Sequence, residues 1–175
     1  MELAPRAQRQ IIGRMEPLEP PALHQAQAAY GWLELGNVEE AFAELERLPE
    51  ELQLLPAVQA VRLDCLMAAK DWNAAVKLAQ VLCGQWAEEP GLWLHHAYAA
   101  RRCAGGSIEA ACELLAPCVE RFPEEWLIPY NVACYLCQME RLEEARAMLE
   151  MARAKGGERV DTMAKDDEDL APLNL

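Results

Sequence analysis

A short pattern recurs four times along the chain at nearly constant spacing, and it limits the possible folds more than any other feature. Each copy opens with a small or polar pair, continues with an apolar residue and places an alanine three residues later. The alanines are 34, 36 and 34 residues apart, and they are Ala41, Ala75, Ala111 and Ala145. The apolar residues that precede them are Val38, Trp72, Ile108 and Leu142. Similarity at a fixed period of this length is typical of proteins built from stacked structural repeats.

The stretch before each copy has its own regular pattern. In LIPYNVACYLCQM, for example, apolar residues recur at spacings of three and four, which predicts an amphipathic helix. The segment around each alanine predicts a second helix, and few β-branched residues compete for sheet. Turn signals separate the two helices of each pair at Gly36-Asn37, Lys70-Asp71, Gly105-Gly106 and Glu140-Arg141. Prolines mark the boundaries between pairs at Pro21, Pro56, Pro90 and Pro123, where a helix can begin but not continue.

The recurring alanines have a steric explanation. Two antiparallel helices joined by a short turn approach closely only where one side chain is small, and a larger residue at these positions would push the helices apart. One helical hairpin cannot bury its own apolar face, so neighbouring hairpins must stack. The sequence therefore predicts an all-α fold of stacked helix pairs.

These features resemble the tetratricopeptide repeat family over residues 22–155, and YNVACYLCQMERLEEARAMLEMA is the stretch most similar to it. The resemblance implies a right-handed α-α superhelix, or solenoid, of four helix hairpins with a short C-terminal capping helix. The four repeats cover residues 22–55, 56–91, 92–125 and 126–155. The chain departs from the family pattern in three places: an early helix end at Leu48-Pro49, the charged pair Arg62 and Asp64 in a first helix, and a longer second helix near Cys83–Trp86.

The two ends lie outside the repeats. Residues 1–21 predict a short helix around Ala7–Met15 and a proline-rich connector, and the alternative is a frayed terminus. At the other end, residues 156–175 begin with a glycine pair that stops a helix, and a further helix is expected from Glu158 to about Lys165. This C-terminal segment is expected to cap the last repeat with Val160, Met163, Leu170 and Leu173. The competing interpretation is an acidic tail that recruits a basic partner.

In the tetratricopeptide family, the first helix of each repeat lines a concave groove that binds ligands. The resemblance places eight candidate partner-binding residues in this groove: Leu23, Tyr30, Leu33, Met67, Trp93, His96, Tyr130 and Cys134. The columns where some family members clamp a C-terminal carboxylate hold Ala26, Tyr30, Ala60 and Asp64, so no such clamp is expected. We therefore expect a scaffold or adaptor whose groove binds a peptide or protein with apolar side chains. Three alternatives stay open: a cytosolic export chaperone like those of type III secretion, a self-associating structural protein, and a groove filled by the chain's own terminus.

Composition narrows the class of partner. The chain has 16 Lys and Arg residues against 29 Asp and Glu, a formal charge of −13, which argues against binding nucleic acid or anionic membrane surfaces. No stretch approaches the ~20 consecutive apolar residues of a membrane span, and the N-terminus lacks the apolar core of a secretory signal. Seven cysteines, an odd number, fit a reducing compartment better than a disulfide framework, so we expect a cytoplasmic protein.

The sequence gives little support for a catalytic or metal-binding site. Cys134 and Cys137 share a helix face and could join His96 and Cys103 as zinc ligands, but a second cysteine pair at the required spacing is missing. These cysteines are better explained as small apolar packing residues. No nucleophile triad, phosphate loop or HExxH motif is present. We expect no enzyme activity, no cofactor and no metal.

Overall fold

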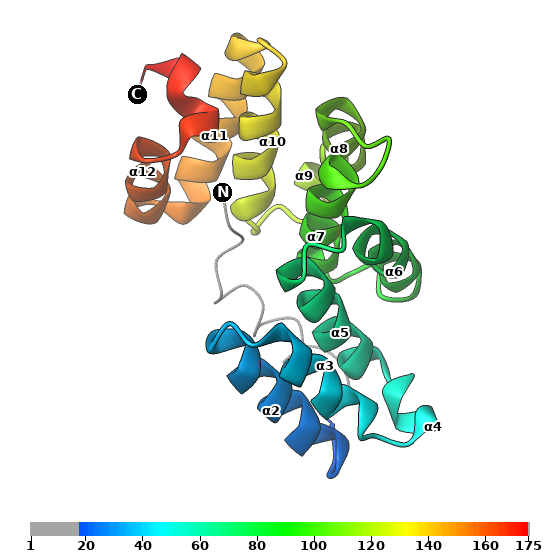
Figure 1. Cartoon of the computed structure of the whole chain (residues 1–175). Coiled ribbons are helices and arrows are strands. Elements are labelled where there is room, and N and C mark those ends of the chain that lie inside the picture. The colour runs from blue at the N-terminus through cyan, green and yellow to red at the C-terminus, as the bar shows by residue number, and fades with distance from the viewer. Residues whose placement is uncertain (1–17, 175) are drawn as a thin grey trace. The chain divides into compact units, whose positions relative to one another are not determined.

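The computed structural model describes residues 18–174, and over this range the chain is entirely helical (Figure 1). These residues form eleven α-helices and one 3-10 helix, with no β-strand among them. The expected all-α class is therefore confirmed. The helix expected around Ala7–Met15 lies outside the described residues.

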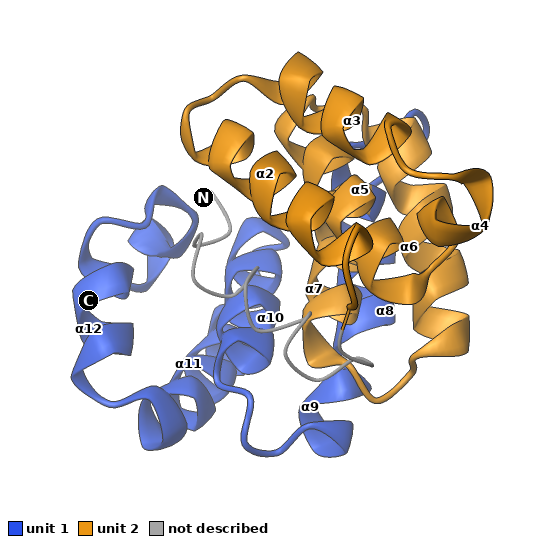
Figure 2. Cartoon of the chain, turned by 90° about the horizontal axis from the view of Figure 1, so that it is seen from below, with its two compact units in different colours: residues 1–2, 100–175 blue, residues 3–99 orange. Residues whose placement is uncertain are grey.

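The chain divides into two compact units, and the division falls within one helix, between Ala99 and Ala100 (Figure 2). Unit 2 contains α2 (Ala22–Glu34), α3 (Val38–Glu46), α4 (Glu50–Gln53), α5 (Pro56–Ala68), α6 (Trp72–Gln85) and most of α7 (Pro90–Arg102). Unit 1 contains the end of α7 and then α8 (Ile108–Leu115), α9 (Cys118–Arg121), α10 (Leu127–Gln138), α11 (Leu142–Gly156), α12 (Glu158–Lys165) and the 3-10 helix η1 (Glu168–Leu173). The division lies inside the third predicted repeat.

Helix hairpins are the building blocks of both units. In unit 2, α2 packs against α3 and α5 packs against α6, while α5 also contacts both helices of the preceding hairpin. In unit 1, α10 packs against α11, and α8 and η1 both lie against α10. Consecutive hairpins therefore stack within unit 2, as the periodicity predicts.

The second helix of each pair begins at the apolar residue that the repeat pattern marks: Val38, Trp72, Ile108 and Leu142. Three of the four helices have side-chain caps, since Asn37, Asp71 and Ser107 each accept a hydrogen bond from the backbone N–H three residues later. Such a bond satisfies a donor that the first turn of a helix leaves free. The turn signals seen in the sequence therefore place the helix starts correctly.

Each of these turns also contains one left-handed residue. The φ angles are +75° at Gly36, +58° at Lys70, +76° at Gly105 and +60° at Glu140. Glycine adopts this conformation freely, whereas for a residue with a Cβ it costs about 1–2 kcal/mol. In the second and fourth predicted repeats, Lys70 and Glu140 therefore adopt the left-handed conformation that glycine adopts in the other two turns.

The four recurring alanines lie in the interior of the fold. Ala41, Ala75, Ala111 and Ala145 are all 0% exposed. Each lies three residues after the first residue of its second helix, at the end of the first turn. The steric reason inferred from the sequence is thus consistent with their burial.

The places where the sequence departs from the repeat pattern differ in helix length. The helix α3 ends at Glu46, before Leu48-Pro49, as expected. The helix α6 has 14 residues, as expected from the 36-residue spacing between Ala75 and Ala111. Two short helices, α4 and α9, are additions that the sequence pattern does not predict. The C-terminal helix α12 spans the range expected for it.

Candidate functional site

An apolar pocket lies along one face of α2 in unit 2. It has a volume of about 410 Å³, and its lining is Leu18, Leu23, Ala26, Gln27, Tyr30, Gly31 and Glu34. From Leu23 onward these residues recur at spacings of three and four, so they form a single stripe on the helix. The pocket brings together two of the predicted groove residues, Leu23 and Tyr30.

The other predicted groove residues of unit 2 do not line this pocket. Leu33 is half-buried on α2, and Met67 is buried on α5. The indole of Trp93 donates a hydrogen bond to the Ala87 carbonyl at 2.8 Å, which holds the ring near the start of α7. His96 is half-buried; burial lowers its pKa, and its Nδ1 has no hydrogen-bond partner within the described residues.

A buried charged cluster connects three helices of unit 2. The hydroxyl of Tyr30 on α2 donates a hydrogen bond to Asp64 Oδ2 on α5 at 2.8 Å. The second carboxylate oxygen of Asp64 lies 3.1 Å from His95 Nε2 on α7. Asp64 and His95 are each only 2% exposed. Asp64, which departs from the repeat pattern, therefore connects the first helices of three successive predicted repeats.

The surroundings of His95 favour its protonated form. Its Nδ1 lies 2.7 Å from the carbonyl oxygen of Gly91, so both ring nitrogens face oxygen acceptors. Burial by itself would lower the pKa of His95, but the Asp64 carboxylate and the Gly91 carbonyl outweigh it and raise the pKa above its usual value. The Nε2 contact is close but poorly aligned for a hydrogen bond, so we describe it as an ion pair. The sequence pattern marks Asp64 as unusual but gives no signal for His95.

In unit 1, the C-terminal segment covers the two remaining predicted groove residues. Tyr130 donates a hydrogen bond to Asp167 Oδ2 at 2.8 Å, and the Cys134 thiol lies 3.7 Å from the same oxygen. Both side chains are fully buried. Burial and the neighbouring Asp167 carboxylate raise the pKa of each. No partner can contact Tyr130 or Cys134 while this segment is in place, because neither residue is exposed.

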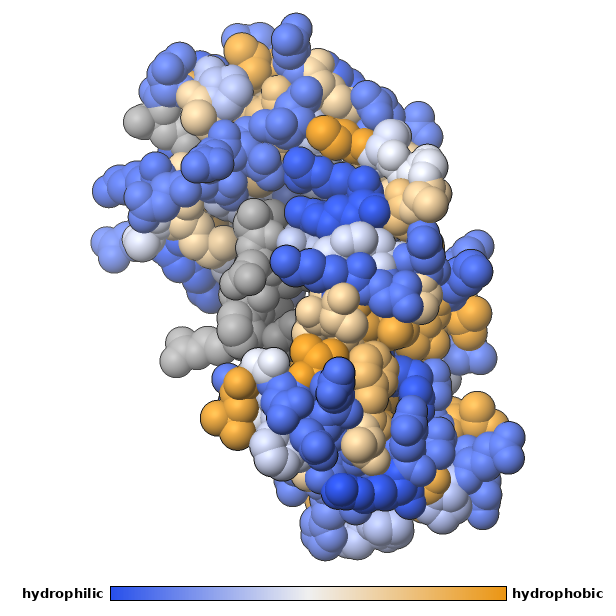
Figure 3. All heavy atoms as spheres, in the orientation of Figure 1, coloured by the Kyte–Doolittle hydropathy of each residue, from blue (hydrophilic) through white to orange (hydrophobic). Residues whose placement is uncertain are grey.

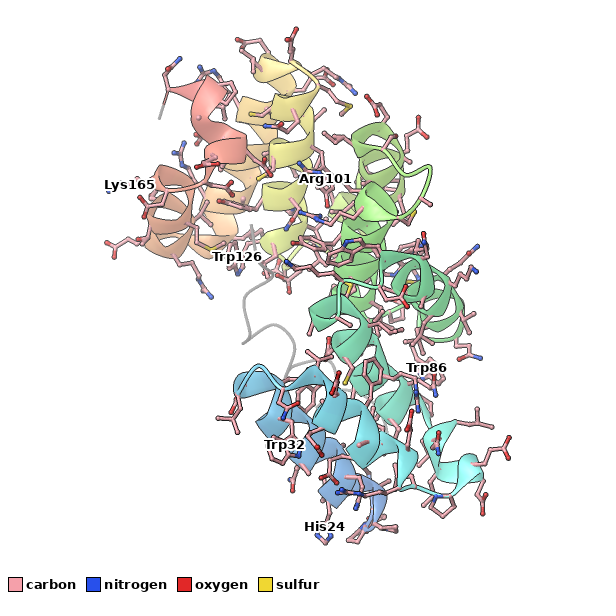
Figure 4. The ribbon with its side chains drawn as sticks, in the orientation of Figure 1. His24, Trp32, Trp86, Arg101, Trp126 and Lys165 are labelled. Atoms are coloured by element: carbon pink, nitrogen blue, oxygen red, sulfur yellow. The ribbon has the colours of Figure 1, made fainter. Side chains whose placement is uncertain are left out.

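Polar contacts fix the C-terminal segment at several points. Arg101, whose side chain is labelled in Figure 4, forms an ion pair with Asp169 at 3.1 Å, and its guanidinium lies 5.8 Å from the centre of the Tyr135 ring. Arg146 donates a hydrogen bond to the carbonyl oxygen of Leu173 at 2.9 Å. Of the four apolar residues expected to cap the last repeat, Val160, Leu170 and Leu173 are buried and Met163 is half-buried. The segment therefore packs as part of unit 1.

Burial covers most of the cysteines and disfavours their reactive form. None of the seven forms a disulfide within the described residues, and all except Cys103 are buried. Burial raises the pKa of Cys65 to about 12 and also raises that of Cys112, Cys118 and Cys137. A cysteine reacts as its thiolate, which a raised pKa disfavours. Among residues 18–174, no group of three or more His, Cys, Asp or Glu side chains is arranged to hold a metal ion.

The surface is mixed in character. Figure 3 shows hydrophobic residues interspersed among hydrophilic ones on one face of the molecule. The large apolar side chains most exposed to solvent are Leu35, Leu54, Val81 and Met151. No helix within the described part of the chain combines the length and apolar character needed to cross a membrane.

Comparisons with family models, curated proteins and solved structures find no match to this chain.

Proposed function

We propose that this chain is a protein-binding scaffold of the tetratricopeptide type, in which four stacked hairpins form a right-handed superhelix. It binds a peptide or protein partner through the exposed faces of its first helices. The function is binding alone and requires no catalytic group, cofactor or metal. The single observation that carries the proposal is the complete burial of the four alanines that recur every 34 to 36 residues.

Within unit 2, the pocket on α2 is the surface best suited to a partner. Its volume of about 410 Å³ falls within the range of ordinary ligand pockets. Tyr30 supplies an aromatic face at this pocket, and the hydrogen bond to Asp64 holds its hydroxyl in place. Aromatic residues held in this way are favoured anchors at protein interfaces. The partner would insert apolar side chains between Leu23 and Tyr30.

Gly31 allows this proposal to be tested without damaging the fold. It lies in the last turn of α2, lines the pocket, and has open space where a Cβ would be. A glycine within a helix is less favourable than a residue with a side chain, so Gly31→Arg blocks the pocket while preserving stability. Gly84 in α6 has the same open surroundings and lies outside the pocket, which makes Gly84→Arg a matched control.

The experiment immobilises the full-length chain, exposes it to extract from its own cells and quantifies the captured proteins by mass spectrometry. We expect at least one protein to be captured by the unaltered chain and by Gly84→Arg, and to be depleted tenfold or more with Gly31→Arg. Equal capture by all three chains would show that the α2 pocket does not bind the partner.

A further inference from the structure

A second groove lies in unit 1, and it shares no residue with the α2 pocket. Its volume is about 670 Å³. One wall is formed by α8 and α9, the other by α11, and residues of α10 lie between them. This second wall extends from Arg141, the residue before α11, to Met151, which is about 15 Å at the helical rise of 1.5 Å per residue. The groove can therefore accommodate two to three turns of another helix.

The interior of this groove is apolar and rich in methionine. Met139, Met148 and Met151 line it together with Val132 and Leu136. Met151 is 44% exposed although it is a large apolar residue. Methionine side chains are flexible and polarizable, so they adapt to apolar partners of different shape. This interior favours an amphipathic helix, which places a stripe of apolar side chains into such grooves.

The charges around the groove are mostly negative. Its lining contains four carboxylates and one guanidinium. The carboxylates are on Glu109, Glu113, Glu120 and Glu144, and all four residues are exposed. The guanidinium belongs to Arg141, which already forms two hydrogen bonds with Glu144, at 2.7 and 2.6 Å. Basic side chains on both flanks of a bound helix would therefore be attracted to this rim.

We propose that this groove is a docking site for a basic amphipathic helix of another protein. The helix places Leu, Met or Phe side chains against the methionines, and its Lys or Arg residues pair with the carboxylates of α8, α9 and α11. A second copy of this chain is a poor occupant, because two chains of formal charge −13 repel each other. The proposal does not depend on the function of the α2 pocket.

The test measures binding of synthetic peptides to the full-length chain by calorimetry. The probe is a peptide of Leu and Lys about four helical turns long, with the leucines on one face. One comparison peptide has the same composition in an order without a leucine face, and another has every Lys replaced by Glu. We expect saturable binding of the probe, at least tenfold weaker binding of the first comparison peptide and no binding of the second.

Two double variants locate the site. Ala116 and Ala147 line opposite walls and are exposed, so Ala116→Arg with Ala147→Arg fills the groove and adds positive charge without disturbing the core. Ala110 on α8 and Ala154 on α11 are also exposed and do not line the groove. We expect Kd to rise at least tenfold with the groove variant, and to change less than threefold with Ala110→Arg and Ala154→Arg, which add the same charge.

A spectroscopic measurement distinguishes docking from general attraction to an acidic protein. Carbon-13 labelling of the methionine methyl groups gives each of the seven methionines its own signal. The probe should shift the signals of Met139, Met148 and Met151 and leave that of Met67 unchanged. Equal Kd values for the two double variants, or equal shifts at all methionines, would overturn the proposal. So would a dimer of the chain that the groove variant alone dissociates, since that would identify a second copy as the occupant.

Discussion

Replacing Asp64 with asparagine should reverse the pH dependence of the contribution that His95 makes to stability. The Asp64→Asn substitution keeps the shape of the side chain and an acceptor for the Tyr30 hydroxyl, but leaves the His95 imidazolium without its counterion, 3.1 Å away. Removing one partner of a buried ion pair costs about 3–5 kcal/mol. Because the imidazole can lose its proton, we expect the lower value, about 3 kcal/mol, at a pH near 5.5, where it is most strongly charged.

The sign follows from the pKa of His95. In the unaltered chain Asp64 raises this pKa, so the stabilisation is fully present below the unfolded value of about 6.5 and is lost as pH rises through the folded value. Without Asp64, burial dominates and lowers the pKa, so the contribution of His95 to stability is lost as pH falls. The lowered pKa of His96 affects both chains alike, and it cancels from their difference.

The assay is urea unfolding followed by circular dichroism at several pH values between about 5.5 and 9. The difference in free energy of unfolding between the two chains should shrink by at least about 1 kcal/mol across this range, since one unit of pKa is worth about 1.4 kcal/mol. Tyr30→Phe is the matched control, because it removes one hydrogen bond, worth about 1 kcal/mol, and leaves the ion pair. If Asp64→Asn and the unaltered chain show parallel pH profiles, the assignment of a charged His95 is wrong.

Three further predictions concern unit 1. Gly106→Ala should destabilise the chain by about 2 kcal/mol or more in urea unfolding, because its Cβ would collide with the backbone carbonyl oxygen of Ala100; an unchanged midpoint would contradict this. Deleting residues 166–175 removes η1 and its two buried leucines, which should cost about 3–6 kcal/mol and speed amide hydrogen exchange in α10; unchanged exchange there would show that the segment does not cover it. A thiol reagent should modify Cys103 first in the native chain, because the other six cysteines are buried, and peptide mapping that finds them modified equally fast would refute this.

The sequence predicts where the helices begin better than it predicts which surfaces could bind a partner. Helix starts at Val38, Trp72, Ile108 and Leu142 follow from local information, namely a turn signal and the position of the alanine. Such information is carried by neighbouring residues and needs no knowledge of tertiary contacts. The short helices α4 and α9 escape prediction because four residues are too few to show a periodic pattern.

The candidate site depends on contacts between distant residues, which the sequence alone does not reveal. Asp64 stands out as a departure from the repeat pattern, but its pairing with His95 requires the relative rotation of α5 and α7. The aligned columns place Tyr130 and Cys134 in a groove without indicating that Asp167 lies against them. The acidic, methionine-rich groove escapes prediction because its lining comes from α8, α9, α10 and α11 together.

The most direct test of the repeat architecture is urea unfolding of the variants Ala41→Leu, Ala75→Leu, Ala111→Leu and Ala145→Leu, each measured separately. All four alanines are fully buried, so each substitution should lower the free energy of unfolding by about 1–3 kcal/mol through overpacking. Ala68→Leu on the exposed end of α5 is the control and should change it by less than about 0.5 kcal/mol. If the four variants are as stable as this control, the small side chains are not what brings the paired helices together.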